Sequence, residues 1–157
     1  MKVKFVVVGK TDTGYLQEAI SMYENRLKHY IPFELICIPD VKNFGKLNES
    51  QLKSREGKSI LAQLNSGDEL ILLDEKGKSF SSLEFSLFLS KKIIAGNKCI
   101  VFAAGGAYGF SDEVYNNASS MIALSQMTFT HQMVRLIFVE QLYRAFTIMK
   151  GEAYHHG

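Results

Sequence analysis

Short apolar runs alternate with longer segments of helical periodicity along the entire chain. The runs rich in Val, Ile, Leu and Phe predict strands buried on both faces, and they occupy residues 3–8, 33–38, 69–73, 98–103 and 121–124. The segments between them place apolar residues three or four positions apart, which predicts helices over residues 15–29, 51–64, 81–94 and 130–150, with a short helix capped by Ser111. The polar residues 40–49 and 75–78 predict a loop and a turn.

Strands that alternate with helices predict an α/β fold, a mostly parallel sheet of five to six strands flanked by helices on both faces. The chain has 157 residues, which corresponds to one domain spanning residues 1–157. Ligands bind such sheets at the carboxyl ends of the strands. The loops after Leu73, Ala104 and Leu124 are therefore the first places to look for a site.

The predicted last helix has no single apolar stripe. Its first half is polar around His131 and Arg135, whereas its second half is polar around Glu140 and Arg144, on a different side. A helix that is apolar on different sides along its length is buried by more than one neighbour. We infer a homodimer interface along this helix; the alternative is a central helix within one monomer.

Composition excludes several classes of protein. The formal net charge of +2 gives no strong electrostatic footprint for nucleic acid or an anionic membrane. Cys37 and Cys99 lie in apolar runs, so we expect two buried thiols and neither a disulfide framework nor a metal site. The apolar run after Lys2 is too short for a signal peptide or a membrane span, and we expect a cytoplasmic protein without a membrane partner.

Two glycine-containing loops are candidate ligand loops. The sequence of residues 9–11, GKT, resembles the end of a P-loop, but Lys4 stands where that motif requires glycine, so a tight turn is the better interpretation. Residues 105–109, GGAYG, allow close approach of the backbone to a ligand, although a tight turn without a ligand explains them equally well.

The segment 124–132 is rich in hydroxyl and amide groups, which can bind a flat heterocycle between the apolar side chains of Met127 and Phe129. Thr128 or Thr130 can also cap the helix that follows. The chain ends in GEAYHHG, in which Tyr154 offers a stacking face next to two histidines. By composition alone this tail is expected to be frayed.

Taken together, the loop GGAYG, the segment LSQMTFTHQMVRLIFVEQLYRAF (124–146) and the tail GEAYHH (151–156) resemble the ribosomal RNA large subunit methyltransferase H family of the SPOUT class. The N-terminal segments VVVGK (6–10) and PFELICIPD (32–40) also match the family, so the resemblance extends over essentially the whole chain. It implies a C-terminal trefoil knot, a homodimer, and S-adenosylmethionine as methyl donor. The donor site it implies consists of Leu73, Gly105, Gly106, Leu124, Ser125, Gln126, Met127, Thr128 and Phe129.

The reaction implied by the resemblance is methylation of N3 of a pseudouridine in large-subunit ribosomal RNA on the assembled ribosome. Methyl transfer from a sulfonium requires alignment and exclusion of water, and no metal. His131 and His155 are candidate bases for the N3 proton, with Tyr154 positioning the target base. Arg135, Arg144 and His156 are candidate contacts to RNA.

Two positions depart from the family pattern. Thr130 replaces a proline before the motif histidine, and His156 replaces a basic residue in the tail. Two other functions remain open: a tRNA methyltransferase of the same class, and a non-enzymatic dimeric α/β module that binds a ligand.

Overall fold

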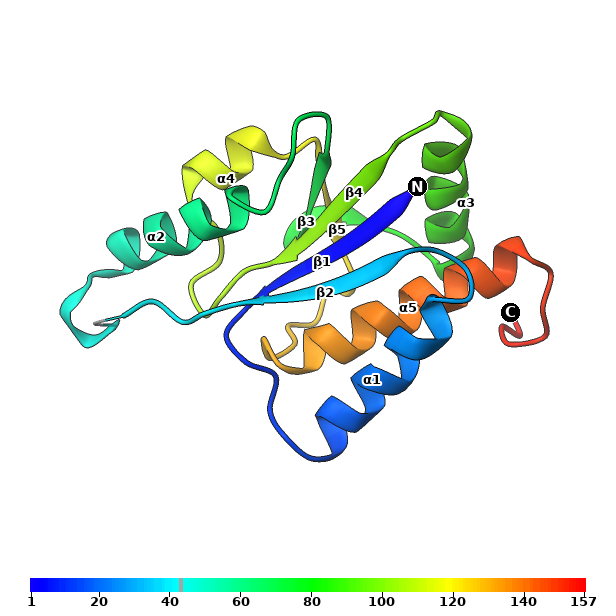
Figure 1. Ribbon diagram of the computed structural model, residues 1–157, viewed down its shortest axis with the longest axis horizontal. Coiled ribbons are helices and arrows are strands. Elements are labelled where there is room, and N and C mark those ends of the chain that lie inside the picture. Colours follow the sequence, from blue (N-terminus) through cyan, green and yellow to red (C-terminus); the bar gives the residue numbers. More distant parts are fainter. Residues whose placement is uncertain (43) are drawn as a thin grey trace.

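The computed structural model describes residues 1–42 and 44–157. Within them, five parallel strands form one sheet in the order β2-β1-β4-β3-β5 (Figure 1). The strands are β1 (Lys2–Val8), β2 (Phe33–Ile38), β3 (Glu69–Ser79), β4 (Cys99–Ala104) and β5 (Ser120–Ala123). The helices are α1 (Tyr15–Leu27), α2 (Glu49–Leu61), α3 (Ser82–Ile94), α4 (Asp112–Asn117) and α5 (Met133–Met149), with a 3-10 helix η1 (Phe44–Lys46). The predicted α/β fold with a parallel sheet is confirmed.

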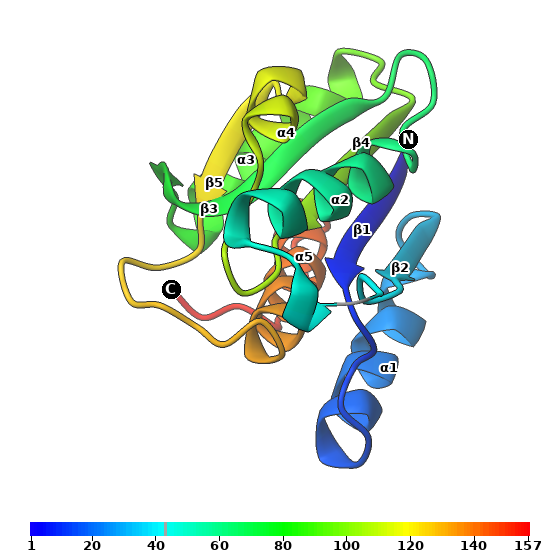
Figure 2. The same ribbon diagram turned by 90° about the vertical axis from the view of Figure 1, so that its left-hand side faces the viewer.

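Helices cover both faces of the sheet, which explains why its strands are apolar throughout. Helices α1, α3 and α5 pack on one face, and α2 and α4 on the other (Figure 2). All six residues of β4 are buried between these layers. On the α5 face, Phe138 lies with its ring centroid 4.5 Å from that of Phe5 and 4.8 Å from that of Phe102, so the core joins α5 directly to two central strands.

Helix α5 runs between α1 and α3 and packs against both. Its buried side chains include Phe138, Leu142 and Phe146, which lie in the core shared with those two helices. The drift of its apolar face is therefore explained within one chain, because different parts of the helix face different neighbours. A central helix within the monomer, the alternative interpretation, accounts for the apolar pattern of α5. This pattern is therefore no longer evidence for a homodimer.

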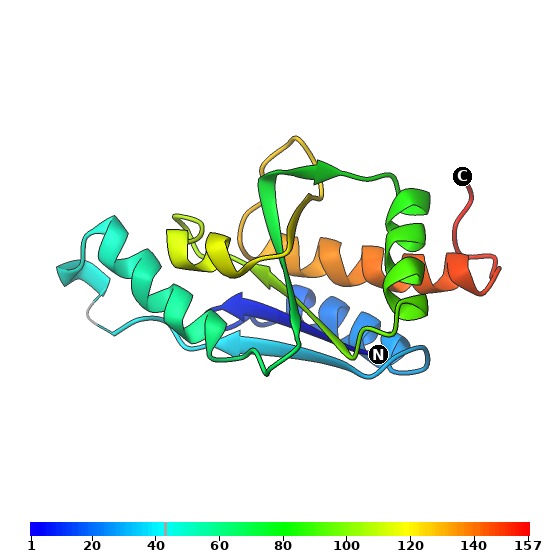
Figure 3. The ribbon, with the colours of Figure 1, turned by 90° about the horizontal axis from the view of Figure 1, so that it is seen from above.

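The polar segment 75–78 does not form the predicted turn, because it lies within β3. Leu73 and Lys78 both pair with Ile122, so the residues between them form a bulge and the strand then resumes its pairing with β5. Figure 3 shows β3 changing direction before α3. Gly77 permits this path, since a Cβ there would lie 2.6 Å from the backbone nitrogen of Ile122.

Capping residues set the starts of several helices. The predicted cap of α4 is confirmed, because the hydroxyl of Ser111 accepts a hydrogen bond from the backbone N–H of Val114. Asn48 forms a capping box with Gln51, which starts α2 two residues earlier than predicted. The expectation of two buried thiols is wrong for Cys37, which is exposed on the edge strand β2, whereas Cys99 is buried.

Candidate functional site

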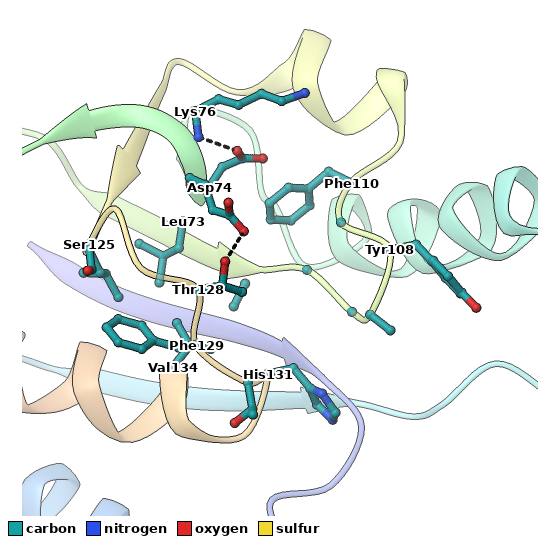
Figure 4. A pocket seen from close by; sticks show the side chains of 18 of the residues that line it. Leu73, Asp74, Lys76, Tyr108, Phe110, Ser125, Thr128, Phe129, His131 and Val134 are labelled. Carbon is teal, nitrogen blue, oxygen red and sulfur yellow. Dashed lines mark hydrogen bonds between the residues drawn. The ribbon is translucent and has the colours of Figure 1, made fainter.

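A cavity of about 780 Å³ opens at the carboxyl ends of β3, β4 and β5. Eight of the nine residues predicted to bind the donor line it, and His131 lies on its wall. The eight are Leu73, Gly105, Gly106, Leu124, Ser125, Met127, Thr128 and Phe129. Gln126, the ninth, is exposed and does not line the cavity. Figure 4 shows Ser125 and Phe129 on one side of the cavity and Tyr108 on the other.

The loop 105–109 is a tight turn and also a wall of this cavity. The backbone N–H of Gly109 donates to the carbonyl oxygen of Gly106 over 3.1 Å, and Gly109 has a φ of 82°. A Cβ on Gly105 would lie 3.1 Å from the backbone of Gly109, and a Cβ on Gly106 would lie 2.5 Å from Oε2 of Glu56. The tight-turn interpretation of this loop is confirmed, and glycine at positions 105 and 106 lets neighbouring groups come close. Close approach of the loop to a ligand stays a prediction.

Hydroxyl groups fix the shape of the loop between β5 and α5. Ser125 Oγ accepts from the backbone N–H of Met127 over 2.9 Å, and Thr128 Oγ1 donates to Glu75 Oε1 over 3.2 Å. Thr130 Oγ1 accepts from the backbone N–H of Met133, which caps the first turn of α5 as one of the two predicted caps. Phe129 is half-buried, but the side chain of Met127 is 78% exposed, so only Phe129 forms a packed apolar wall.

The site contains polar groups that the sequence analysis missed. Asp74, Glu75 and Lys76 follow Leu73 directly and line the cavity, together with Tyr115 from α4. Asp74 accepts a hydrogen bond from the hydroxyl of Tyr115 and another from its near neighbour, the backbone N–H of Lys76. Burial and the hydrogen bond to Asp74 raise the pKa of Tyr115 to about 12. Asp74, Glu75 and Lys76 directly follow a predicted strand, and this position could have identified them as site residues. The sequence analysis passed over them because it interpreted residues 75–78 as a turn.

The prediction that Arg135 contacts RNA is wrong, because its side chain is completely buried. Its guanidinium donates to the carbonyl oxygens of Val8 (2.7 Å), Gly9 (2.8 Å) and His131 (3.1 Å), and to the hydroxyl of Thr11 (3.0 Å). A buried charge needs such partners. Arg135 therefore joins the loop after β1 to the start of α5. The predicted tight turn at GKT is wrong: the chain bends at Gly9, and an irregular loop held by this arginine continues until α1 begins at Tyr15.

The tail follows the C-terminal end of α5 (Figure 1). Helix α5 has 17 residues, so its rise of about 1.5 Å per residue separates its ends by roughly 25 Å. The tail is docked and not frayed: Arg144 donates from Nη1 to Nδ1 of His155 over 3.1 Å, and its guanidinium carbon lies 4.9 Å from the ring centroid of Tyr154. His156 is exposed. The structure thus does not bring the tail and His131 together within one chain.

Tyr154 is tied down by its hydroxyl group. It donates to Oε1 of Glu140 over 3.0 Å and forms a hydrogen bond of 3.1 Å with the hydroxyl of Tyr23. Burial, followed by these two hydrogen bonds, raises the pKa of Tyr154 above its ordinary value. Its hydroxyl therefore stays protonated at physiological pH, and the ring is held against α5 and α1.

The cavity fits a nucleoside with an amino-acid side arm. Its volume lies within the roughly 300–1,000 Å³ of sites that bind molecules of drug size. The glycine turn leaves room beside the backbone of Gly105 and Gly106, Leu73 and Phe129 provide apolar walls, and Asp74 provides a carboxylate. A buried carboxylate oxygen of Glu56 lies behind the turn without a hydrogen-bond partner among the described residues. Apolar walls suit a flat heterocycle, and carboxylates suit a cation, so the residues present fit S-adenosylmethionine.

His, Cys, Asp and Glu side chains within residues 1–42 and 44–157 form no cluster of three or more that is arranged to hold a metal ion. No helix in that same part has the length and apolar character required to cross a membrane.

Comparison with known proteins identifies the family. The model of a family described as "Predicted SPOUT methyltransferase" matches residues 1–155. Proteins named "Ribosomal RNA large subunit methyltransferase H" from Parabacteroides distasonis, Christiangramia forsetii and Flavobacterium johnsoniae are 58%, 54% and 54% identical to this chain. Each alignment covers 99% of this chain and 99% of the relative. This chain is therefore a methyltransferase that belongs to the SPOUT family, in the group of ribosomal RNA large subunit methyltransferase H proteins.

Proposed function

We propose that this chain transfers the methyl group of S-adenosylmethionine to N3 of a pseudouridine in large-subunit ribosomal RNA, with the assembled ribosome as substrate. One observation carries the proposal: the ends of three strands converge on a single cavity lined by eight of the nine predicted donor-binding residues. The names of the relatives support ribosomal RNA as the target. Assembled ribosomes are found in the cytoplasm, which is where we expect the protein.

The donor, when bound, supplies a methyl group already activated by a positively charged sulfur. The chain has to hold it, orient the acceptor nitrogen in line and exclude water. Leu73 and Phe129 are the apolar walls for the adenine ring in this proposal. The backbone of the turn 105–109 and of the loop 124–129 provides hydrogen bonds, and the side-chain contacts of Ser125 and Thr128 keep that loop in place.

The acceptor N3 carries a proton that must leave during the reaction. His131 is exposed on the wall of the cavity, two residues before α5 begins, and is the candidate base closest to the donor. An imidazole can accept a proton near neutral pH. The carbonyl oxygen of His131 accepts from Arg135, which fixes the backbone at this point.

The tail enters the proposal through a second copy of the chain. The hydroxyl of Tyr154 contacts Glu140, and the ring of His155 contacts Arg144. These two contact residues lie six and ten positions after Val134 on the cavity wall, roughly 9 and 15 Å along α5. If Tyr154 positions the target base and His155 assists proton removal, a homodimer has to present the tail of one copy to the cavity of the other. Arg144 and His156 would then contact RNA phosphates beside it.

The C-terminal trefoil knot remains part of the proposal. Membership of the SPOUT family supports it. In a knotted arrangement the loops 105–109 and 124–132 would be threaded through each other, which would hold the cavity walls in place before the donor binds. Such preformed walls favour binding, because little loop entropy is lost.

The decisive experiment supplies labelled S-adenosylmethionine to assembled ribosomes, isolated large subunits and bulk tRNA in parallel. We expect label in the ribosomal RNA of assembled ribosomes, at one pseudouridine. Label in tRNA alone would replace the ribosomal target with tRNA. A folded chain that binds the donor but transfers label to none of the three would overturn the proposed reaction.

A further inference from the structure

Glu56 is a buried carboxylic acid that the proposed reaction does not use. It lies in α2 with 6% of its surface exposed, and its Oε1 has no hydrogen-bond partner among the described residues. Buried carboxylates are normally paired with a cation or with several hydrogen-bond donors, because an isolated charge is costly to bury. The position of Glu56 in the fold therefore calls for an explanation.

The carboxylate lies directly behind the cavity wall. A Cβ on Gly106 would be 2.5 Å from Oε2 and 2.9 Å from Oε1 of Glu56, so the carboxylate packs against the backbone of the turn. Gly106 itself lines the cavity. The next residue of α2, Gly57, packs closely against Ser111 and Val114, so the absence of a side chain at position 57 lets α2 lie close to the start of α4. One residue of backbone thus separates Glu56 from the cavity.

Among the residues that the structure describes, no neighbouring cation balances the charge of Glu56. Burial raises its pKa, and the negative charge of Asp40, which follows β2, raises it further. The turn 105–109 contributes no charged group, and its titratable side chain, Tyr108, is 47% exposed. Helix α4 brings Ser111 and Val114 to this region, both uncharged. On α2 itself, the nearest preceding lysine is Lys53. It forms an ion pair with Glu49, on the side of Lys53 that faces away from Glu56 in the sequence.

The two ligands of the proposed reaction differ by one unit of charge. When the methyl carbon forms its bond to nitrogen, the carbon–sulfur bond breaks, the sulfur retains the electron pair and becomes neutral, and the N3 proton leaves to the base. The donor is therefore a sulfonium cation, whereas the product S-adenosylhomocysteine is a neutral thioether. An unbalanced carboxylate behind the cavity wall attracts the positively charged sulfur of the donor, whereas the neutral thioether of the product gains no such charge–charge attraction.

We propose that Glu56 acts through the turn 105–109 as an electrostatic selector, which strengthens binding of the cationic methyl donor relative to its neutral product. It is a positioning residue that does not touch the reacting atoms. Because it is buried, its field is screened less than that of Glu49 or Glu75, which are exposed on the cavity rim. This selection would also promote product release. The inference rests on the proposed function, since it requires S-adenosylmethionine as ligand.

The test compares three ligands by isothermal titration with the full chain. These are S-adenosylmethionine, S-adenosylhomocysteine and sinefungin, in which a protonated amine replaces the sulfonium. We expect Glu56→Gln to weaken binding of both cationic ligands by roughly tenfold, the effect of one charge pair at moderate distance, and to change binding of the neutral product less than twofold. Glu56→Asp, which keeps the charge, should restore part of the preference. Glu18→Gln, the same change at an exposed position of α1 that does not line the cavity, is the matched control and should have little effect.

A pH series gives a second readout that a purely structural role would not change. In the wild type, the preference for S-adenosylmethionine over S-adenosylhomocysteine should decrease as the pH is lowered and Glu56 takes up a proton. In Glu56→Gln it should change less. His131 on the cavity wall is present in both proteins, so the difference between them isolates Glu56.

Three results would overturn the inference. An equal loss of affinity for all three ligands would show that Glu56 only supports the shape of the turn. An unchanged ratio of affinities in Glu56→Gln, with normal wild-type binding, would refute the selector and leave the proposed function intact. A folded wild-type chain that binds neither S-adenosylmethionine nor S-adenosylhomocysteine would refute the proposed function and the selector together.

Discussion

Arg135 donates a hydrogen bond of 2.7 Å from Nη2 to the backbone carbonyl oxygen of Val8, joining the last helix to the end of the first strand. The two residues are 127 positions apart in the sequence. The same guanidinium also holds the carbonyl oxygens of Gly9 and His131. One buried side chain thus fixes the loop after β1 and the segment that carries the candidate base.

Replacing Arg135 with Leu should lower the free energy of unfolding by roughly 2–4 kcal/mol, because several buried carbonyl groups lose their donor. Chemical denaturation monitored by circular dichroism measures this loss. Arg135→Lys should recover only part of it, since one ammonium group cannot reach the same set of acceptors. The salt dependence of ribosome binding should be the same for wild type and for Arg135→Leu, measured under conditions where both are folded. A reduced slope would indicate that Arg135 contacts phosphate after all.

Replacing Gly106 with Ala should destabilise the protein by about 1–3 kcal/mol, because the new methyl group overlaps the carboxylate of Glu56. Combining it with Glu56→Ala should cost less than the sum of the two single changes, as measured in a double-mutant cycle of unfolding free energies. Gly45→Ala is the control, since a Cβ at that position meets nothing within 4 Å. Strict additivity at positions 56 and 106 would contradict the contact.

Replacing Tyr115 with Phe should reduce stability by about 1.5–3 kcal/mol near neutral pH, the usual value for a hydrogen bond to a charged group such as Asp74. Burial and this hydrogen bond raise the pKa of Tyr115 in the folded protein from 10 to about 12. Its contribution is therefore fully present below pH 10 and decreases as the pH rises to about 12. Denaturation curves of the two proteins should converge over that interval. Tyr108→Phe, an exposed position in the same cavity, should have no such effect.

Replacing Glu56 with Gln should make the protein more stable at pH 8, by about 1–3 kcal/mol, because a buried unpaired charge is removed. The pKa of Glu56 is raised in the folded state, so the folded protein binds more protons than the unfolded chain above pH 4.5. Wild-type stability from this group is highest below that pH and decreases as the pH rises. The gain in Glu56→Gln should thus vanish near pH 4. A variant that is less stable at pH 8 would show that the carboxylate has a partner.

Mixing two inactive variants should restore methylation if the tail acts across a homodimer. His131→Ala and His155→Ala each remove one candidate base, from the cavity and from the tail. After subunit exchange in an equal mixture, about half of the dimers contain one copy of each variant. Each mixed dimer has one cavity that combines an intact His131 with an intact His155 from the other copy, and one cavity that has neither. About a quarter of the wild-type activity is therefore expected. Methyl transfer to assembled ribosomes measures this recovery. Activity in His155→Ala alone that equals wild type would remove the tail from the proposal.

The elements of the fold could be predicted from sequence because their causes are local. β-branched runs, helical spacing and caps such as Ser111 act within a few residues, and the predicted strands and helices are all present with shifted ends. The segment 75–78 shows the limit of such reasoning. Its polar and glycine residues resemble a turn, but β5 provides backbone partners on the edge of the sheet, and β3 continues past the bulge to Ser79.

Part of the site could also be predicted from the sequence, because the positions of the strand ends are set by local patterns. The residues at the strand ends were found because the carboxyl ends of parallel strands share one edge, and family motifs pointed to the same loops. Asp74 and Tyr115 were missed, since their contact joins a strand end to a helix that comes 41 residues later. The burial of Arg135 could not be seen either, because a polar residue on a predicted helix is expected to face water.

The α/β class, the alternation of strands and helices, the loops that carry the site and the family resemblance all follow from the order of the residues. The order of the strands, the burial of Arg135, the placement of Glu56 behind Gly106 and the separation of the tail from His131 became visible only in the folded chain, because these features depend on contacts between distant residues. Local patterns fix where elements begin and end, but only the packing of the whole chain decides which side chains meet.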